Sequence, residues 1–307
     1  MGNQLQSTLI YSVLVVVMLI APSSAITRCL CDTSANYALL MDFYGHTSCW
    51  LNSSGWGDPS VLICDWYGIT CTGEDVVKVN LQANNITGTL PPSWGELKRL
   101  RFLDLSYNRL TGTLPLSWTS MSQLQQLYLF DNGLTGTLPP SWGSILSLQQ
   151  MDLGDNDLTG TLPPLWGNME QLQSLFVYGN SLTGTLPPAW ASMAQLQYLN
   201  LNANSLTGTL PQSWANIATL QMLELYGNGF TGTLPSSWGS IVRLQQLSLF
   251  SNNLTGPLPP SWGNLTQLDY LTLCCPGDHN RFYRPVPSSW EKHPTLVMGV
   301  RWCVLIP

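Results

Sequence analysis

One strictly periodic repeat governs most of this chain. Its hallmark is the hexapeptide LTGTLP or a close variant, and the copies start at Ile86, Leu110, Leu134, Leu158, Leu182, Leu206, Phe230 and Leu254. All seven gaps between these starts have the same length, without a single insertion or deletion. Because each unit of such a repeat contacts its neighbours in the same way, the chain is predicted to form one elongated solenoid.

The first half of the unit, as in LQQLYLFDN from Leu124, follows the leucine-rich-repeat pattern LxxLxLxxN. The pattern predicts a short strand in which Leu127 and Leu129 point into the core. The asparagine after it is expected to bond backbone groups that the bend leaves unpaired. This asparagine recurs at Asn84, Asn108, Asn132, Asn156, Asn180, Asn204, Asn228 and Asn252. A ladder of side-chain amides is predicted for a second column, Gln125, Gln149, Gln173, Gln197, Gln221 and Gln245.

The second half of the unit combines glycine, proline and tryptophan. Glycine in TGT permits a positive φ or a close backbone approach, and proline fixes an extended or turn conformation. A buried tryptophan removes roughly 150–250 Å² from solvent. The periodic tryptophans are therefore predicted to form a second apolar ladder of the scaffold, not a binding site. They are Trp94, Trp118, Trp142, Trp166, Trp190, Trp214, Trp238, Trp262 and Trp290.

Charge limits the classes of partner. Charged residues make up 9% of the chain, against roughly 25% in an average soluble domain. Between Phe102 and Leu273 the basic side chains are Arg109 and Arg243. Two basic side chains cannot neutralise a phosphate backbone, and nucleic acid is therefore excluded as a partner.

Positions that differ from unit to unit can encode a particular ligand. On a strand, side chains alternate between the core and the predicted concave surface. The outward positions hold aromatic and acidic residues, a combination that favours recognition of a protein or glycan. The alternative is that aromatic residues merely suit a strand and cover the sheet. The predicted ligand-binding residues are Phe102, Asp104, Tyr128, Phe130, Asp131, Asp152, Asp155, Phe176, Tyr178, Tyr198, Glu224, Tyr226, Phe250 and Tyr270.

Catalysis and metal binding are weaker interpretations of the same acids. Asp131 and Asp155 share a column on adjacent coils, which would place two carboxylates at a separation of about 5 Å, near that of a retaining glycosidase. The same acids offer oxygen ligands to Ca²⁺. However, a repeat places like residues side by side without selection for chemistry, and no enclosing pocket is expected. The sequence predicts no enzyme, no cofactor and no metal site.

The region before the repeats resembles the N-terminal cap of plant-type extracellular leucine-rich-repeat proteins. The similar segments are ALL at residues 38–40, CDWYGITC at residues 64–71 and VVKVNLQANNITGTLP, which follows. The resemblance implies a disulfide between Cys64 and Cys71, and Cys31 matches an earlier cysteine of the family. A pairing of Cys31 with Cys49 is also proposed.

The combination GTLPPSW resembles the repeats of the promastigote surface antigen group, cell-surface proteins of kinetoplastids. This resemblance covers about residues 31–303 and implies a surface or shed protein that makes contact with a host or the environment. It implies the fold of an α/β-class leucine-rich-repeat solenoid, a right-handed curved coil. We expect a parallel concave β-sheet, an extended or 3-10 convex side, and caps with disulfides. Recognition or adhesion is the expected function; the alternatives are an inhibitor of a secreted hydrolase and a structural coat protein without a specific ligand.

The period breaks once near the C-terminal end, where four extra residues enter the unit between Trp262 and Trp290. Cys275 and Cys303 follow these two tryptophans at the same interval, which places them in one column of adjacent coils. Neighbouring strands lie about 4.8 Å apart, which permits a disulfide. Cys29 and Cys274 are left without an assigned partner.

The first residues resemble an export signal. An apolar core, LIYSVLVVVMLIA, precedes Ser23 and Ala25, the small residues expected before a cleavage site. An uncleaved anchor is the alternative. The tail TLVMGVRWCVLIP contains Arg301 and lacks the polar spacer of a lipid-anchor signal, which favours secretion over anchorage at the cell surface. Membrane contact would then require the uncleaved segment or a missed anchor.

The predicted organisation is an export signal at residues 1–25, a cap at 26–75, repeats at 76–275, and a last irregular repeat with a C-terminal cap at 276–307. A secretory route agrees with glycosylation sequons at Asn52, Asn85, Asn253 and Asn264.

Overall fold

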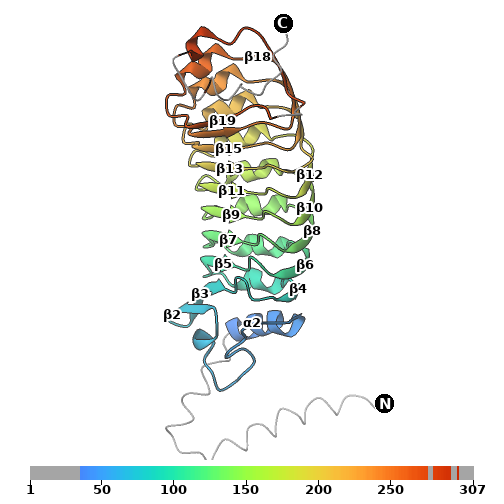
Figure 1. The fold of residues 1–307 in the computed structure, drawn as a ribbon. Coiled ribbons are helices and arrows are strands. Elements are labelled where there is room, and N and C mark those ends of the chain that lie inside the picture. The colour runs from blue at the N-terminus through green and yellow to red at the C-terminus, as the bar shows by residue number, and fades with distance from the viewer. Residues whose placement is uncertain (1–34, 276–278, 292–295, 297–307) are drawn as a thin grey trace, which may run out of the picture.

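The computed structural model describes residues 35–275, 279–291 and 296. These residues form a stack of coils that rises from a cap at the N-terminal end to the last coil (Figure 1). A full coil has three sides: a strand of one long parallel sheet, a strand of a second parallel sheet, and a 3-10 helix. The predicted leucine-rich-repeat solenoid is confirmed.

The first side of each coil belongs to a ten-stranded sheet in the order β19-β17-β15-β13-β11-β9-β7-β5-β3-β2. Apart from the antiparallel pair β2–β3, neighbouring strands are parallel, and their residues pair at the repeat spacing, as in Leu103 with Leu127 and Leu127 with Met151. The strands are β2 (Ile69–Thr72), β3 (Asp75–Asn80), β5 (Phe102–Asp104), β7 (Gln126–Tyr128), β9 (Gln150–Asp152), β11 (Ser174–Phe176), β13 (Tyr198–Asn200), β15 (Met222–Glu224), β17 (Gln246–Ser248) and β19 (Tyr270–Thr272).

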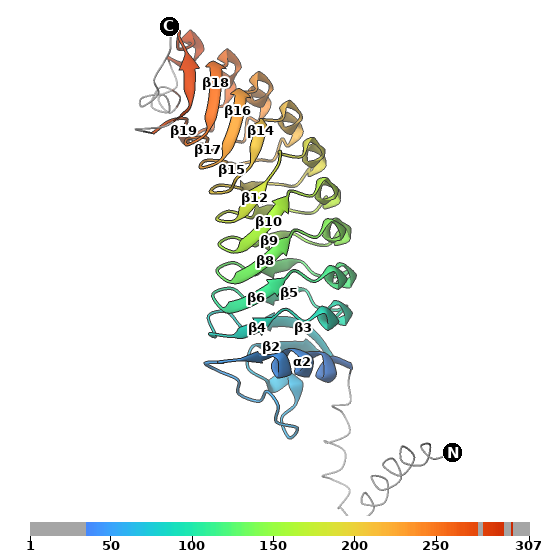
Figure 2. The ribbon, with the colours of Figure 1, turned by 90° about the vertical axis from the view of Figure 1, so that its right-hand side faces the viewer.

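The TGT segments form further parallel strands, which the sequence analysis did not predict. Figure 2 shows this side of the solenoid facing the viewer. A six-stranded sheet contains β1 (Thr47–Ser48), β4 (Thr87–Thr89), β6 (Arg109–Thr113), β8 (Gly133–Thr137), β10 (Asp157–Thr161) and β12 (Ser181–Thr183). In it, the cap strand β1 pairs antiparallel with β4. A four-stranded sheet continues with β14 (Thr207–Thr209), β16 (Gly229–Thr233), β18 (Asn253–Pro257) and β20 (Arg281–Tyr283). The sequence allowed this glycine a positive φ or a close backbone approach, and Gly136 has a φ of 80° within a paired strand.

The third side is a column of 3-10 helices, each of which follows a proline in an extended conformation. They are η3 (Pro92–Glu96), η4 (Leu116–Ser120), η5 (Pro140–Ser144), η6 (Pro164–Asn168), η7 (Pro188–Ser192), η8 (Gln212–Asn216), η9 (Ser236–Ser240), η10 (Pro260–Asn264) and η11 (Ser288–Trp290). The column confirms the predicted 3-10 side of the coil.

The periodic tryptophans are buried in the core, as predicted. Trp142 is 0% exposed, and its indole Nε1 donates to the carbonyl of Pro115 in the preceding coil at 3.0 Å. Its ring lies 6.1 Å from that of Trp118, at an angle of 5° between the planes. Each indole therefore fills the core and also satisfies a backbone carbonyl of its neighbour.

The asparagine column bonds the turning backbone, as predicted. In Asn156, Oδ1 accepts from the Leu134 N–H at 3.0 Å, and Nδ2 donates to the carbonyls of Leu129, Leu153 and Gly154. One side chain thus holds groups of its own coil and of the coil before it. The glutamine ladder is present in part, since Gln221 Nε2 donates to Gln197 Oε1 at 3.3 Å.

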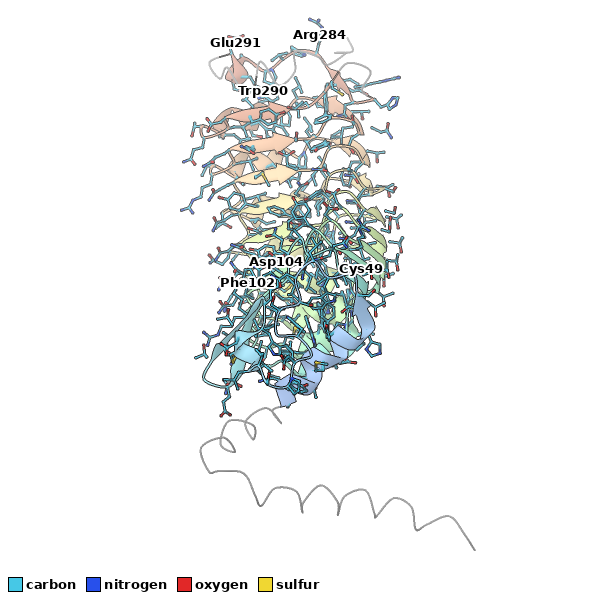
Figure 3. The ribbon with its side chains drawn as sticks, turned by 60° about the horizontal axis from the view of Figure 1, so that its bottom comes forward. Cys49, Phe102, Asp104, Arg284, Trp290 and Glu291 are labelled. Atoms are coloured by element: carbon cyan, nitrogen blue, oxygen red, sulfur yellow. A yellow bond between two sulfur atoms is a disulfide. The ribbon has the colours of Figure 1, made fainter. Side chains whose placement is uncertain are left out.

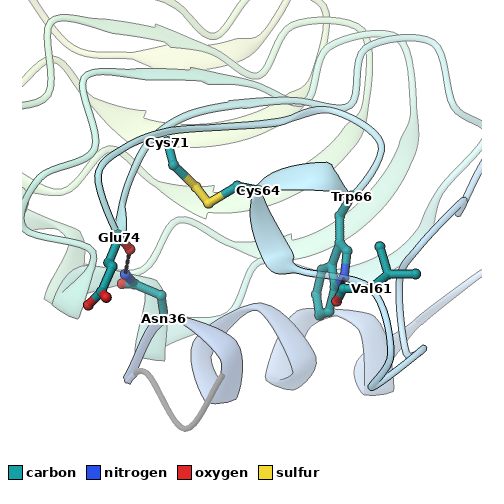
Figure 4. Close-up of a disulfide and its surroundings, with 6 residues drawn as sticks. All are labelled: Asn36, Val61, Cys64, Trp66, Cys71 and Glu74. Atoms are coloured by element: carbon teal, nitrogen blue, oxygen red, sulfur yellow. Dashed lines mark hydrogen bonds between the residues drawn. A yellow bond between two sulfur atoms is a disulfide. The ribbon is translucent and has the colours of Figure 1, made fainter. Parts of the chain in front are cut away.

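The cap closes the N-terminal end with α2 (Ala35–His46), η2 (Ile63–Asp65) and a group of aromatic rings. Phe43 of α2 packs on Trp94 of the first coil, with ring centroids 4.7 Å apart. Cys64 and Cys71 form the predicted disulfide, with a Cα–Cα distance of 5.5 Å (Figure 4). Beside it, Asn36 Nδ2 donates to the carbonyl of Glu74 at 3.1 Å, which ties α2 to the hairpin (Figure 4).

The other cysteine predictions fall partly outside the described residues. Cys49 is an exposed free thiol, and its predicted partner Cys31 lies outside the described part, so this pairing stays a prediction. Cys274, which the sequence left without a partner, is disulfide-bonded. Cys303 also lies outside it, so the Cys275–Cys303 pairing stays a prediction.

The extra residues near the C-terminal end leave the scaffold columns intact. Asn280 takes the place of the next asparagine, and its Oδ1 accepts from the Leu254 N–H at 2.8 Å. Trp290, labelled in Figure 3, is buried and donates to the carbonyl of Pro259 at 3.0 Å. The export segment at residues 1–25 lies outside the described residues. Within the described ranges, no helix is both long enough and apolar enough to cross a bilayer.

Candidate ligand-binding face

The concave face is defined as two sets of side chains. The first is the outward side chains of the ten-stranded sheet. The second is the pair of residues that follows the buried residue after each strand, such as Phe130 and Asp131 after Leu129. In β7, Leu127 is buried while Gln126 and Tyr128 are partly exposed on the other side of the strand. The chain then continues through buried Leu129 to Phe130 and Asp131. Because side chains alternate along a strand, every coil presents a similar set of positions with its own residues.

The structure brings the predicted aromatic residues together on this face. Phe102 and Tyr128 contact each other with ring centroids 5.7 Å apart, and Tyr226 and Phe250 stack at 4.5 Å. Tyr198 and Tyr270 are the most open of the predicted set, at 37% and 50% exposure. The predicted aromatic residues that are partly exposed are Phe102, Tyr128, Phe130, Phe176, Tyr178, Tyr226 and Phe250.

Three further residues shape the face and were missed from the sequence. Tyr107 is 51% exposed and packs against Phe130 with ring centroids 4.9 Å apart. The Tyr178 ring lies directly over Gly154, and the Asp155 carboxylate lies against Gly179, so neither glycine has room for a side chain. The sequence does contain a signal for Gly154: most coils carry a larger residue at the equivalent position, so a glycine there indicates that a neighbouring side chain occupies the space.

The predicted acids differ in their surroundings. Asp104 is buried, and its Oδ1 accepts from the Ser106 N–H at 3.0 Å and from the Ser106 hydroxyl at 2.6 Å. The expectation that Asp104 is exposed to a ligand is therefore wrong, because this short side chain folds back onto its own strand end. Figure 3 labels Asp104 beside Phe102, on the same strand.

Asp131, Asp152 and Asp155 lie close to one another in the middle of the face. Asp152 is half-buried, and its Oδ1 accepts from the Gly154 N–H at 2.9 Å. Asp131 and Asp155 are exposed and adopt the left-handed conformation, with φ values of 55° and 47°. These carboxylates therefore lie at the bend where the strand turns away from the sheet.

Burial and mutual repulsion both act on these groups. Burial, together with the charges of Asp155 and Asp104, raises the pKa of Asp152 to about 6, although the hydrogen bond from Gly154 acts in the opposite direction. Burial, followed by the charge of Asp131, raises the pKa of Asp155. The pKa of Tyr178 rises to about 12 through burial and the neighbouring carboxylates, so its phenol remains a hydrogen-bond donor. Burial also raises the pKa of Glu224.

Ion pairs within the described residues involve Lys98, Arg99 and His46, and none of them reaches these carboxylates. Lys78 of β3 lies on the same sheet, but its Nζ sits over the Phe102 ring, 4.4 Å from the ring centroid. Acidic and partly dehydrated carboxylates that make no ion pair attract positively charged groups. The surface is open, and no group of three or more His, Cys, Asp or Glu residues arranged for a metal occurs in the described part. A hollow of about 600 Å³ lies elsewhere, between η5 and η6, where Ser144, Leu146 and Asn168 line it.

Two models of the family described as leucine rich repeat match the chain, one at residues 75–134 and 170–230, the other at residues 147–169 and 243–265. Together they cover more than half of the chain, at the coils described above. The chain is a leucine-rich-repeat protein. Both models describe repeats and not a catalytic domain.

Solved structures of plant receptors are similar to this leucine-rich-repeat protein. The ectodomain of the Arabidopsis thaliana receptor kinase GASSHO1/SCHENGEN3, in complex with CASPARIAN STRIP INTEGRITY FACTOR 2, is 28% identical with a TM-score of 0.72. The match covers 83% of this chain and 34% of that one. The Arabidopsis receptor kinase HAESA, in complex with the peptide hormone IDA and the co-receptor SERK1, is 27% identical with a TM-score of 0.67 and coverages of 82% and 47%. The resemblance to plant-type extracellular leucine-rich-repeat proteins is thus confirmed.

Two other similarities are narrower in what they show. A plant ice-binding protein is 21% identical, with a TM-score of 0.64 over 86% of this chain and 93% of that one, which concerns the fold alone. The Arabidopsis receptor-like kinase GSO2 is 37% identical over 51 residues, 17% of this chain and 4% of GSO2. The leucine-rich-repeat protein therefore matches only a small part of this curated relative and about a third to a half of the receptor ectodomains.

Proposed function

We propose that this leucine-rich-repeat protein recognises an extracellular peptide or protein segment on its concave face, and that the segment carries positively charged side chains. The observation that carries the proposal is the group of Asp131, Asp152, Asp155 and Tyr178, which has no cation of its own among the described residues. Aromatic rings on both sides supply apolar contact area, and the carboxylates supply charge complementarity.

The receptors with similar ectodomains support a ligand of this kind. HAESA is described in complex with a peptide hormone and a co-receptor, and RGFR1 as a peptide hormone receptor in complex with RGF2. An extended segment suits a face whose residues change along one axis, because each coil can contact a different side chain of the ligand. The carboxylates would select lysine, arginine or a free amino terminus.

A display library of random linear peptides, panned on the purified chain, tests the proposal. We expect the selected peptides to be rich in lysine and arginine, and their binding to weaken as salt is added. Tyr178→Ala should weaken binding by about 2 kcal/mol, roughly thirtyfold, which is typical of an anchor residue. Tyr283→Ala is the matched control, because it removes an exposed tyrosine from β20 in the other sheet.

The other functions correspond to different outcomes of the same experiment. A coat protein without a specific ligand predicts that no peptide sequence is enriched. An inhibitor of a secreted hydrolase predicts one-to-one binding to such an enzyme, with loss of its activity. Selection of peptides that bind equally well to wild type and Tyr178→Ala would contradict the proposed face.

The route and organisation of the chain remain proposals that fit this function. They comprise an export signal at residues 1–25, a cap at 26–75, repeats at 76–275, a final repeat and cap at 276–307, and kinship with the promastigote surface antigen group. Of the sequons, Asn253 and Asn264 are exposed, while Asn52 and Asn85 are half-buried and hydrogen-bonded. Glycosylation at the exposed pair would appear as a mass shift after expression in a secretory host.

A further inference from the structure

The strands of the second side turn two threonines outward in each coil from β6 to β16. The threonine face is defined as Thr111, Thr113, Thr135, Thr137, Thr159, Thr161, Thr183, Thr185, Thr207, Thr209, Thr231 and Thr233, all of which are exposed. Their strands lie one above the next on the side shown in Figure 2. Unlike the concave face, this surface has the same residues in all the coils from β6 to β16; Pro257 ends it in β18.

The threonines of successive coils are paired by the strand register. The second threonine of each coil lies beside the first threonine of the next, as in Thr137 with Thr159 and Thr161 with Thr183. The pairing crosses the gap between β12 and β14, where Thr185 and Thr207 form an isolated bridge. Neighbouring strands are about 4.8 Å apart, so the paired side chains form a two-dimensional lattice with a fixed spacing.

Local contacts hold these side chains in place. The first threonine of a coil donates its hydroxyl to a glycine carbonyl of the preceding coil, as in Thr159 Oγ1 to Gly136 at 3.3 Å. The methyl of the second threonine lies over the glycine of the next coil: a Cβ added at Gly160 would be 2.8 Å from Thr137 Cγ2. Branching at Cβ restricts the rotamers further. The side chains are therefore ordered before any ligand arrives.

The hydroxyls of the second threonines remain available. For Thr113, Thr137 and Thr161, no hydrogen bond from or to the hydroxyl is seen in the described part of the chain. These groups are exposed, so they bond to water. The face thus presents free hydroxyls and methyls at a constant repeat, on a rigid support.

A surface that repeats without variation can match only a ligand that also repeats. Crystalline polysaccharides are bound through aromatic rings, and the threonine positions contain none. Charged minerals need rows of charge, whereas the column that flanks the first threonines has Gly133, Ser181 and Ser205 beside isolated Arg109 and Asp157. Neutral hydroxyls and methyls at a spacing similar to that between equivalent oxygen atoms in ice suit a lattice of water molecules. We propose that the threonine face binds the surface of ice.

Ice growth in the presence of the purified chain tests this proposal. We expect wild type to keep ice grains small during annealing and to shape single crystals. The double variant Thr137→Tyr, Thr161→Tyr should lose both effects, because two large rings would lift the face from a flat crystal. Gln171→Tyr is the matched control, since Gln171 is exposed but lies after η6 on another side of the solenoid, and it should keep wild-type activity.

A second variant guards against a failure to fold. Thr137→Val with Thr161→Val keeps the methyl and the shape but removes two available hydroxyls, so it should weaken ice binding while the unfolding temperature stays near that of wild type. Absence of any effect of wild type on ice would overturn the proposal. So would full activity in folded tyrosine variants, or binding to crystalline cellulose or chitin that these variants abolish. The concave face is unchanged in all these threonine variants. Peptide binding to it can therefore be measured separately from ice binding, and either proposal can fail without the other.

Discussion

The concave face and the threonine face are built from the same repeat, yet they differ in what they repeat. On the concave face the second outward position reads Tyr128, Asp152, Phe176 and Asn200 in successive coils. On the threonine face the corresponding positions read threonine in all the coils from β6 to β16. Both faces lie on the same core of leucine, asparagine and tryptophan. The comparison teaches that the shared core determines where the surface side chains lie. Whether those side chains vary from coil to coil determines whether the surface can distinguish one ligand from another.

The largest expected effect removes the core that the two faces share. Trp142→Ala should destabilise the fold by about 3–5 kcal/mol, because it leaves a large cavity and an unpaired carbonyl at Pro115. Chemical unfolding followed by fluorescence measures the change, and Tyr270→Ala, at an exposed ring, is the control. If one face survived the substitution intact while the other was lost, the two faces would not share a cooperative core.

A smaller loss is expected from the asparagine that bridges coils behind the concave face. Asn156→Ala should cost about 2–3 kcal/mol, since it leaves the Leu134 N–H and several carbonyls without their partner. Asn168→Ala, at an exposed position in η6, should be close to neutral. Equal unfolding midpoints for the two variants would show that water replaces the bridging amide.

Asp152→Asn tests the electrostatics of the concave face alone. Its folded pKa is about 6 against an ordinary value of 3.8, so the ionised form is disfavoured in the fold. The stabilising contribution of the protonated form is complete below pH 4 and is lost as the pH rises through 6. The variant should therefore be more stable than wild type at pH 7 by about 1–2 kcal/mol, less than the full shift because the group is partly exposed.

Measurement of the unfolding midpoint between pH 4 and pH 7 checks this expectation. The gain from Asp152→Asn should disappear near pH 4. Asn200 occupies the same position two coils later and accepts from the Asn202 N–H, so asparagine fits this site. Asp157→Asn, an exposed residue of β10, is the control. A stability gain that did not depend on pH would indicate a packing effect and not relief of a buried charge.

The smallest effect is expected on the threonine face. Thr161→Val should change the stability by less than about 0.5 kcal/mol, because the Thr161 side chain is exposed. Thr159→Val removes the bond to the Gly136 carbonyl and should cost somewhat more, about 0.5–1 kcal/mol. Thermal unfolding distinguishes the two. A larger cost for Thr161 than for Thr159 would contradict the assignment of Thr161 as the available hydroxyl.

The sequence predicted the core well because every core position is repeated. The roles of Trp142 and Asn156 follow from their place in the unit, and the resemblance implied the Cys64–Cys71 disulfide. The strands of the second side were not predicted because a glycine with positive φ is unusual inside a strand, whereas here a φ of about 80° is accommodated within a paired strand. Asp104 was misplaced because alternation along a strand says which way a side chain starts and not whether it folds back onto Ser106.

The sequence by itself determined the coil, its period and the columns of leucine, asparagine and tryptophan, because a regular pattern leaves one register in which all these residues are buried together. Only the tertiary structure decided what lies between coils. It paired Thr137 with Thr159 and not with Thr161, the equivalent residue of the next unit. It also placed the Tyr178 ring over Gly154, beside Asp152. The physical reason is that contacts between coils depend on strand stagger and side-chain direction, which a linear repeat does not specify.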